Sequence, residues 1–261
     1  MRCGAPAQCR WPSGCSARPA DPVGNAAGSC APLACQALQA AQARSIARAF
    51  LPPQVWGNRR DYYYVRSKLG SDPLYDGVLR ALPDDGAPLL DVGCGFGLLA
   101  HVMRQRAVAH PYLGVDVDAG KIARAQRAAA QAELAQVAFA VADAGSALPA
   151  HAGHVVALDV LQYLDACGQQ RLLRQAAAQV ARGARLLLRT PLATGDRRDH
   201  TTRLADRLAW WAGWMGTRPR HYPDPQHLRQ TLQRAGLQVA PARPLHGRTP
   251  FNSWLLVAHR P

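Results

Sequence analysis

The segment PLLDVGCGFGLLA, residues 88–100, constrains the fold more than any other part of the chain. Apolar residues lead into Asp91, and glycines then occupy every second position at Gly93, Gly95 and Gly97. Glycine tolerates a positive φ and carries no Cβ, so this pattern predicts a tight turn from a strand into a helix. In an open α/β sheet such a turn lets a ligand lie against the backbone, although a turn that binds nothing is the alternative. The spacing is Gly-x-Gly-x-Gly, whereas the dinucleotide fingerprint is Gly-x-Gly-x-x-Gly.

Segments typical of strands and of helices alternate along most of the chain. This alternation predicts an α/β fold, Rossmann-like, with a mostly parallel sheet and helices on both faces. The last two strands are joined by HGRTP and are expected to form a terminal antiparallel pair. The expected strands are 88–93, 112–117, 137–143, one within 153–164, 184–190, 237–245 and 252–260. The expected helices are 36–50, two within 58–82, 98–109, 119–134, 169–182, 200–216 and 224–236. Asp72 is the expected N-cap of the second helix within 58–82, with Pro73 at its first position.

Composition divides the chain into three parts. Residues 1–35 are rich in Ala, Pro, Gly and Cys and are expected to form a disordered tail. Residues 36–84 are expected to form an N-terminal helical cap, and residues 85–261 the α/β domain. Five of the seven cysteines lie in the tail, but no Cys-x-x-Cys pair occurs and no pair of histidines lies near them. No metal site is therefore predicted.

The formal net charge is +14, and it is carried almost entirely by arginine, because only Lys68 and Lys121 are lysines. A basic chain suits an anionic partner such as nucleic acid, a membrane surface or an acidic carrier protein. The arginines are scattered along the sequence, which favours a coding bias over an anionic partner as the explanation of the charge. We find no apolar run long enough for a membrane span and no signal peptide, so we expect a cytoplasmic protein.

Two further carboxylates follow the next strands of the expected sheet. Asp116 ends the strand 112–117, where a carboxylate can accept hydrogen bonds from both hydroxyls of a ribose. Its alternative role is a helix cap, for which Asp118 is the better placed residue. Asp143 follows the strand 137–143, where a carboxylate can accept a hydrogen bond from the amino group of an adenine. Together with the glycine turn, these residues indicate an adenosine-containing ligand.

These features together resemble the class I S-adenosylmethionine-dependent methyltransferases. LLDVGCGFG looks like their first motif, GVD like the acidic ribose residue, and VVALDVLQYL is similar to their fourth-strand motif. Gln162 stands where the small-molecule branch commonly has histidine. The resemblance covers roughly residues 61–261, and it implies S-adenosyl-L-methionine as cofactor and a seven-stranded sheet with strand seven between strands five and six. It implies cofactor binding by Asp91, Gly93, Gly95, Gly97, Asp116, Asp143 and Asp159.

Methyl transfer mainly needs alignment of the acceptor with the methyl group, so the resemblance fixes no catalytic residue. The motifs of methyltransferases acting on DNA amino groups, cytosine C5, ribose 2′-oxygens, protein arginines and catechols are missing, which leaves a small-molecule substrate. Arg189 ends an apolar strand and needs either a carboxylate partner or a substrate anion. The predicted catalytic residues are Asp159, Tyr163, Arg189 and His200, and further residues expected at the acceptor pocket are Gln162, Thr190, Asp196 and Arg197. The helix 200–216 is either a packing element or an apolar lid, and Tyr62, Tyr63 and Tyr64 are placed to cover the cofactor.

The segments YYYVRSKLGSDPLY and LDVLQYL also resemble methyltransferases encoded beside aryl-polyene pigment biosynthesis enzymes. That resemblance implies an aromatic or polyenoic acceptor, held on an acidic acyl carrier protein. Three alternatives stay open: an RNA methyltransferase, favoured by charge alone, an NAD(P)-dependent reductase, and a cofactor-binding protein without catalysis. The glycine spacing and the terminal strand pair argue against the reductase.

Overall fold

The computed structural model describes residues 35–54, 56–193, 221–247 and 252–261. The chain divides into residues 1–30 and residues 31–261, and all described residues belong to the second part. The predicted tail, except Cys35, therefore lies outside the described residues, as does the whole expected helix 200–216. The division into tail, helical cap and α/β domain stays a prediction.

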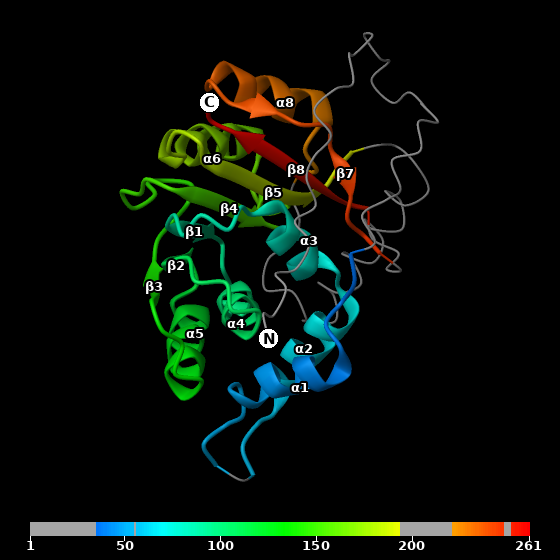
Figure 1. Cartoon of the computed structure of the whole chain (residues 1–261), viewed down its shortest axis with the longest axis vertical. Coiled ribbons are helices and arrows are strands. Elements are labelled where there is room, and N and C mark those ends of the chain that lie inside the picture. Colours follow the sequence, from blue (N-terminus) through cyan, green and yellow to red (C-terminus); the bar gives the residue numbers. More distant parts are fainter. Residues whose placement is uncertain (1–34, 55, 194–220, 248–251) are drawn as a thin grey trace, which may run out of the picture. The chain divides into compact units, whose positions relative to one another are not determined.

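A mixed sheet forms the centre of the fold, in the strand order β3-β2-β1-β4-β5-β8-β6, with β7 paired to β8 (Figure 1). The first five strands run parallel, and β8 runs antiparallel to β5, β6 and β7. The predicted α/β fold and the antiparallel C-terminal strands are confirmed. The strands are β1 (Leu89–Val92), β2 (Tyr112–Asp116), β3 (Val137–Val141), β4 (His154–Leu158), β5 (Arg185–Pro191), β6 (Gln238–Val239), β7 (Arg243–Pro244) and β8 (Ser253–His259).

One expected strand, 237–245, is divided in the structure into β6 and β7. Pro241 and Pro244 lie in this segment, and proline has no N–H to donate to a neighbouring strand. β6 pairs with the end of β8, whereas β7 pairs with its first half, so both pieces stay antiparallel to the same strand. The sheet therefore has eight strands instead of the seven that were expected.

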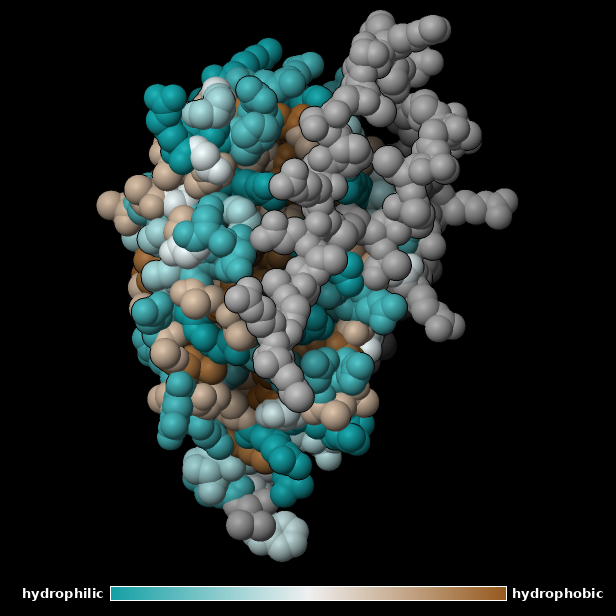
Figure 2. Space-filling view, viewed as in Figure 1, coloured by the Kyte–Doolittle hydropathy of each residue, from teal (hydrophilic) through white to brown (hydrophobic). Residues whose placement is uncertain are grey.

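Helices cover both faces of the sheet (Figure 1). Alternate residues of each strand point to opposite faces, so Leu89 joins one buried cluster and Leu90 the other. The helices that contribute to the first cluster are α1 (Ala40–Arg48), α2 (Arg60–Ser71), α3 (Leu74–Ala81), α4 (Leu98–Gln105) and α5 (Ala119–Gln131). Those that contribute to the second are α6 (Ala166–Gln179) and α8 (Pro225–Arg234), with the short 3-10 turn η1 (Leu161–Tyr163). On the face drawn in Figure 2, hydrophilic residues alternate with smaller apolar areas.

Aspartates fix the starts of three helices. Asp118 accepts a hydrogen bond from the N–H of Lys121 at 3.0 Å and caps α5, as the sequence predicts. Asp224 caps α8 in the same way, with Pro225 in its first turn. Asp165 caps α6, which begins three residues earlier than expected. No helix in the described ranges combines the length and the apolar character needed to cross a membrane.

Candidate functional site

The glycine turn joins β1 to α4 at the carboxyl end of the sheet. The N–H groups of Gly93 and Cys94 both donate to the carbonyl of Val115, at 2.7 and 2.9 Å, so the turn is anchored to the end of β2. Gly93, Gly95 and Gly97 have φ values of +74°, +56° and +69°. L-residues rarely adopt this left-handed region, which explains why three glycines stand here.

The three glycines have different surroundings. A Cβ on Gly93 would collide with the side chain of Val160, and one on Gly97 would collide with the ring of Phe139. A Cβ on Gly95 would meet nothing within 4 Å. Close packing therefore requires the outer two glycines, whereas Gly95 exposes bare backbone to open space where a ligand can approach.

Asp116 ends β2 beside this open backbone. Its Oδ2 accepts a hydrogen bond from the N–H of Gly95 at 2.9 Å, and its Oδ1 accepts one from the N–H of Asp118 at 2.9 Å. The Asp116 carboxylate is buried and is thus held at the glycine turn. Val117, the next residue, is 68% exposed, which leaves an apolar surface beside the carboxylate. Sequence reasoning did not single out Val117, although an apolar residue directly after the acidic one is a usable signal.

Asp91 lies under the turn and is only 2% exposed. Its Oδ2 accepts a hydrogen bond from the Tyr112 hydroxyl at 2.6 Å, but its Oδ1 has no partner in the described part of the chain. Burial raises the pKa of Asp91 to about 7, an effect that the Tyr112 hydrogen bond opposes and the nearby charge of Asp116 reinforces. The site thus holds a buried carboxyl oxygen that a donor or a cation can still satisfy.

Asp143 follows β3, but it is exposed. Its Oδ1 accepts a hydrogen bond from the N–H of Gly145 at 2.8 Å, and its carbonyl accepts bonds from the N–H groups of Ser146 and Ala147. The side chain therefore shapes the loop after β3 at the same edge of the sheet as Asp116, since β2 and β3 pair as far as Asp116 and Val141.

A network of charged side chains lies at the ends of β4 and β5. The two strands pair as far as Leu158 and Arg189, which places Asp159 beside Arg189. The Arg189 guanidinium is buried and pairs with Asp159 through Nη1 and with Asp72 through Nη2, the latter at 3.2 Å. Lys68 joins both carboxylates, at 2.6 Å from Asp72 and 3.5 Å from Asp159.

The network is electrically balanced, with two cations and two carboxylates. Burial alone would lower the pKa of Arg189, but the charges of Asp159 and Asp72 outweigh it and raise that pKa. Burial likewise opposes ionisation of Asp72, yet Arg189 and Lys68 hold its pKa below the usual value. Of the two partners that the sequence allowed for Arg189, a protein carboxylate and a substrate anion, the structure shows the first. Asp159 has a φ of +59°, a strained conformation for a residue with a side chain.

Lys68 and Asp72 were missed as members of the site. Asp72 was expected only as a helix cap, and its Oδ1 does accept a hydrogen bond from the N–H of Leu74 at 3.0 Å. Its second role depends on Arg189, which lies far away in the sequence, so no local pattern indicates it. The sequence offers two separate signals: Asp72 stands at the start of an expected helix, and Arg189 at the end of an apolar strand needs an anionic partner. Nothing in the sequence shows that the two residues meet.

The remaining predicted residues are placed as follows. Gln162 is buried in η1, and its Oε1 has no partner within the described ranges. Tyr163 is half-buried, and Thr190 is fully buried with its hydroxyl bonded to the Pro191 carbonyl at 3.2 Å. Tyr64 lies edge-on against Phe96 of the glycine turn, with ring centres 5.5 Å apart, so α2 does extend over the turn. The predicted residues Asp196, Arg197 and His200 lie outside the described residues.

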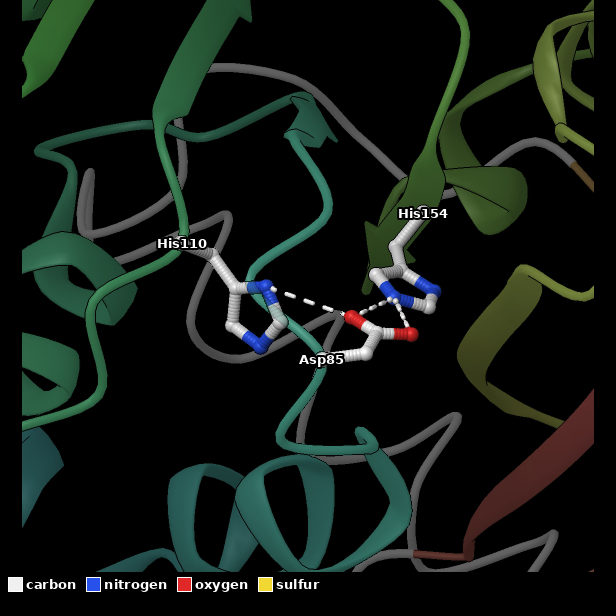
Figure 3. Close-up of side chains that lie close together, drawn as sticks. All are labelled: Asp85, His110 and His154. Carbon is white, nitrogen blue, oxygen red and sulfur yellow. Dashed lines mark hydrogen bonds and ion pairs between the residues drawn. The ribbon is translucent and has the colours of Figure 1, made fainter.

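A second cluster, made of Asp85, His110 and His154, lies at the opposite end of the strands, where β1 and β4 begin (Figure 3). Its three potential ligand atoms lie within 4.8 Å of one another. The N–H of Arg185 donates to Nδ1 of His154 at 3.0 Å, so this nitrogen carries no proton. Nε2 then carries it and donates to Asp85 at 3.0 Å, which leaves no lone pair for a metal. His110 contacts two carbonyl oxygens, those of Ala87 and Pro83, so the cluster is best explained as a link between the loop before β1 and the sheet.

Comparison with known proteins adds a family and several similar folds. The model of a protein family described as a methyltransferase domain matches residues 63–242. No curated relative matches the chain in sequence.

Among solved structures, the chain is similar to the magnesium protoporphyrin IX methyltransferase of Synechocystis PCC 6803 with bound SAH. The identity is 24%, the TM-score is 0.57, and the match covers 82% of this chain and 92% of that one. It is also similar to the mitomycin 7-O-methyltransferase MmcR, with 20% identity, a TM-score of 0.60, and coverage of 78% and 57%. The cyclase SpnF is similar too, with 20% identity, a TM-score of 0.57, and coverage of 85% and 92%. At such identities these likenesses show the fold alone.

Proposed function

We propose that the methyl acceptor of this chain is a small molecule bound above β4 and β5. The chain belongs to the methyltransferase domain family and is an S-adenosylmethionine-dependent methyltransferase. The family match covers more than half of the chain and includes the glycine turn, Asp116 and the charged network. The donor supplies an activated methyl group on a positively charged sulfur. The protein must bind the donor, align the acceptor and exclude water.

The observation that carries the proposed binding site is the open backbone at Gly95 beside the Asp116 carboxylate. A ribose whose hydroxyls bond to Asp116 would lie against this backbone, and Val117 would provide an apolar surface for the adenine. The unpartnered Oδ1 of Asp91 is suited to a cationic group of the donor, such as its ammonium. Asp143 is proposed as the residue that contacts the adenine amino group.

On the acceptor side, we assign Asp159 and Arg189 to positioning. The Asp159 carboxylate pairs with Arg189 and Lys68, so we do not assign it the role of a base. Instead the network fixes the ends of β4 and β5 against α2, next to the Val160 side chain that packs on Gly93. Tyr163 is proposed to line the acceptor pocket, and His200 stays the predicted base for a hydroxyl acceptor.

Small-molecule acceptors agree with the names of two proteins of similar structure, a magnesium protoporphyrin IX methyltransferase and a mitomycin 7-O-methyltransferase. The cyclase SpnF shares the fold and is named for another reaction, so methyl transfer has to be measured directly. The sequence resemblance adds a finer hypothesis, an aromatic or carrier-bound acceptor. Methylation of free metabolites without methylation of carrier-bound aryl acids would contradict it.

Calorimetry with S-adenosylmethionine, S-adenosylhomocysteine and NADH tests the donor site, using Asp116→Ala and the matched control Asp118→Ala. We expect Asp116→Ala to weaken binding of both adenosyl ligands at least tenfold, because charge-assisted hydrogen bonds to the ribose are lost. Asp118→Ala removes only a helix cap and should lower the melting temperature without changing affinity. Unchanged affinity in Asp116→Ala, or preferential NADH binding, would contradict the proposed site.

A further inference from the structure

A pocket with a volume of about 480 Å³ lies between the loop after α1 and the helix α5. Its apolar wall consists of Phe50, Pro52 and Pro53, and its polar wall includes Arg60, Arg124 and Arg127. Arg124 and Arg127 stand three residues apart on α5 and therefore share one face of the helix. The lining contains none of the residues that we propose for methyl-donor binding.

The polar groups of this pocket are mainly hydrogen-bond donors. Three guanidinium groups face a single carboxylate among the described lining residues, that of Asp61, which pairs with Arg124 at 3.4 Å. Asn58 uses its Oδ1 to accept a bond from the N–H of Arg60, so its amide NH₂ remains as a donor. Arg127 is exposed and makes no ion pair or side-chain hydrogen bond within the described ranges. The helix α2 also begins here, and its first two residues, Arg60 and Asp61, line the pocket.

Phe96 of the glycine turn lies next to this pocket. The guanidinium carbon of Arg124 lies 5.0 Å from the centre of the Phe96 ring, and the Phe50 ring lies 6.1 Å from it. Two walls of the pocket therefore contact the residue between Gly95 and Gly97. In Figure 2 the lower end of the view, where the loop after α1 lies in Figure 1, is mainly hydrophilic.

We propose that this pocket is a binding site for a small organic anion, a phosphate or carboxylate attached to an apolar body. Guanidinium groups bind both kinds of oxyanion through paired hydrogen bonds, and Arg127 has these donors to offer. Phe50 and the two prolines provide the surface for the apolar body. The site is independent of the proposed methyl transfer, because its residues and its ligand differ from those of the donor site.

The proposal is tested by calorimetry on the full chain with phenyl phosphate, benzoate and inorganic phosphate as probes. We expect saturable binding of phenyl phosphate or benzoate, and weaker binding of inorganic phosphate because it lacks the apolar body. A stronger response to phenyl phosphate would identify the anion as a phosphate, and a stronger response to benzoate as a carboxylate. Absence of saturable binding by both aromatic probes would overturn the proposal.

Two variants separate a built site from the general positive charge of the chain. Arg127→Glu should weaken probe binding at least tenfold, whereas the matched control Arg174→Glu on α6 should change it less than twofold. Asp61→Asn removes the carboxylate of the pocket and should strengthen binding, an effect opposite in sign to that of damage to the fold. Equal weakening of probe binding by Arg127→Glu and Arg174→Glu would overturn the proposal. The same holds if the wild-type chain binds RNA and both variants weaken that binding to the same extent.

S-adenosylmethionine affinity is measured in the same variants and should stay unchanged. Loss of anion binding with intact donor affinity in Arg127→Glu supports a separate site. If the wild-type chain binds no S-adenosylmethionine but still binds phenyl phosphate, the proposed function fails while the anion site stands.

Discussion

Asp91 is predicted to couple methyl-donor binding to pH. The pKa of this buried carboxyl is about 7 in the free protein, and its Oδ1 has no partner among the described residues. A cationic donor group beside Oδ1 would favour the ionised form, so binding should release a proton below that pH. If only the ionised form binds, lowering the pH from 7 to 5.5 should weaken affinity roughly fifteenfold, which is about 1.6 kcal/mol.

The assay is calorimetric titration with S-adenosylmethionine across this range, in buffers with different ionisation enthalpies to count released protons. The α-amino group of the ligand stays protonated here, since such groups titrate near 7.7–8.0. Asp91→Asn removes the titrating group and should flatten the pH dependence, while Asp118→Asn should keep it. A pH slope that survives in Asp91→Asn would refute the coupling.

The same residue predicts the sign of one stability effect. Because the folded pKa of Asp91 lies above the unfolded value of 3.8, the folded state holds the proton more tightly. The free energy of unfolding should therefore fall as the pH rises from about 4 to 7, by at most about 4 kcal/mol. Asp91→Asn should remove this decline in chemical denaturation, and a decline of equal size in the variant would contradict the assignment.

Four other variants test the packing and the charge pairs of the fold. Gly93→Ala should lower the melting temperature by several degrees because its Cβ would collide with Val160, whereas Gly95→Ala should weaken donor binding more than it lowers that temperature. Equal thermal losses would contradict this division. Arg189→Met should lower the free energy of unfolding by about 3–5 kcal/mol in denaturant titration, because Asp72 and Asp159 lose the Arg189 cation and must share Lys68, and a loss below about 1 kcal/mol would count against the network. Burial opposes ionisation of Asp85, but its hydrogen bonds from His154 and from the Ala87 N–H lower its pKa overall. That contribution is present above pH 3.8 and lost as the pH falls through the folded value, so wild type should lose more stability in acid than Asp85→Asn in pH-dependent unfolding.

Local patterns were sufficient for the scaffold of the site. Glycines at every second position predicted a turn with positive φ angles, because the tolerance of positive φ is a property of glycine itself. The choice of Asp118 as the cap of α5 rested on one side chain and the N–H groups three residues away. Alternating strand and helix segments predicted a mostly parallel sheet with right-handed crossovers, and the family resemblance supplied the position of the last strand.

Contacts between distant segments were beyond the reach of such patterns. Asp72 and Arg189 meet because the link between α2 and α3 lies against the carboxyl end of β5, which no local rule predicts. The link between Asp85 and His154 joins a loop to a strand in the same way, and neither residue stood out in the sequence. Gly93 and Gly95 are equivalent in the sequence pattern. They differ in the structure because the Val160 side chain packs against Gly93 and not against Gly95.

The position of β8 has a consequence for how this protein is made. It lies between β5 and β6 in the sheet, yet it follows both of them along the chain. During synthesis, the edge of β5 that pairs with β8 stays unpaired until His259, the last residue of β8, has been synthesised. That edge carries Arg189 at its carboxyl end, so the nascent chain completes the scaffold around this arginine only at a late step. Until β8 has inserted, this open strand edge can pair with another chain, which favours aggregation.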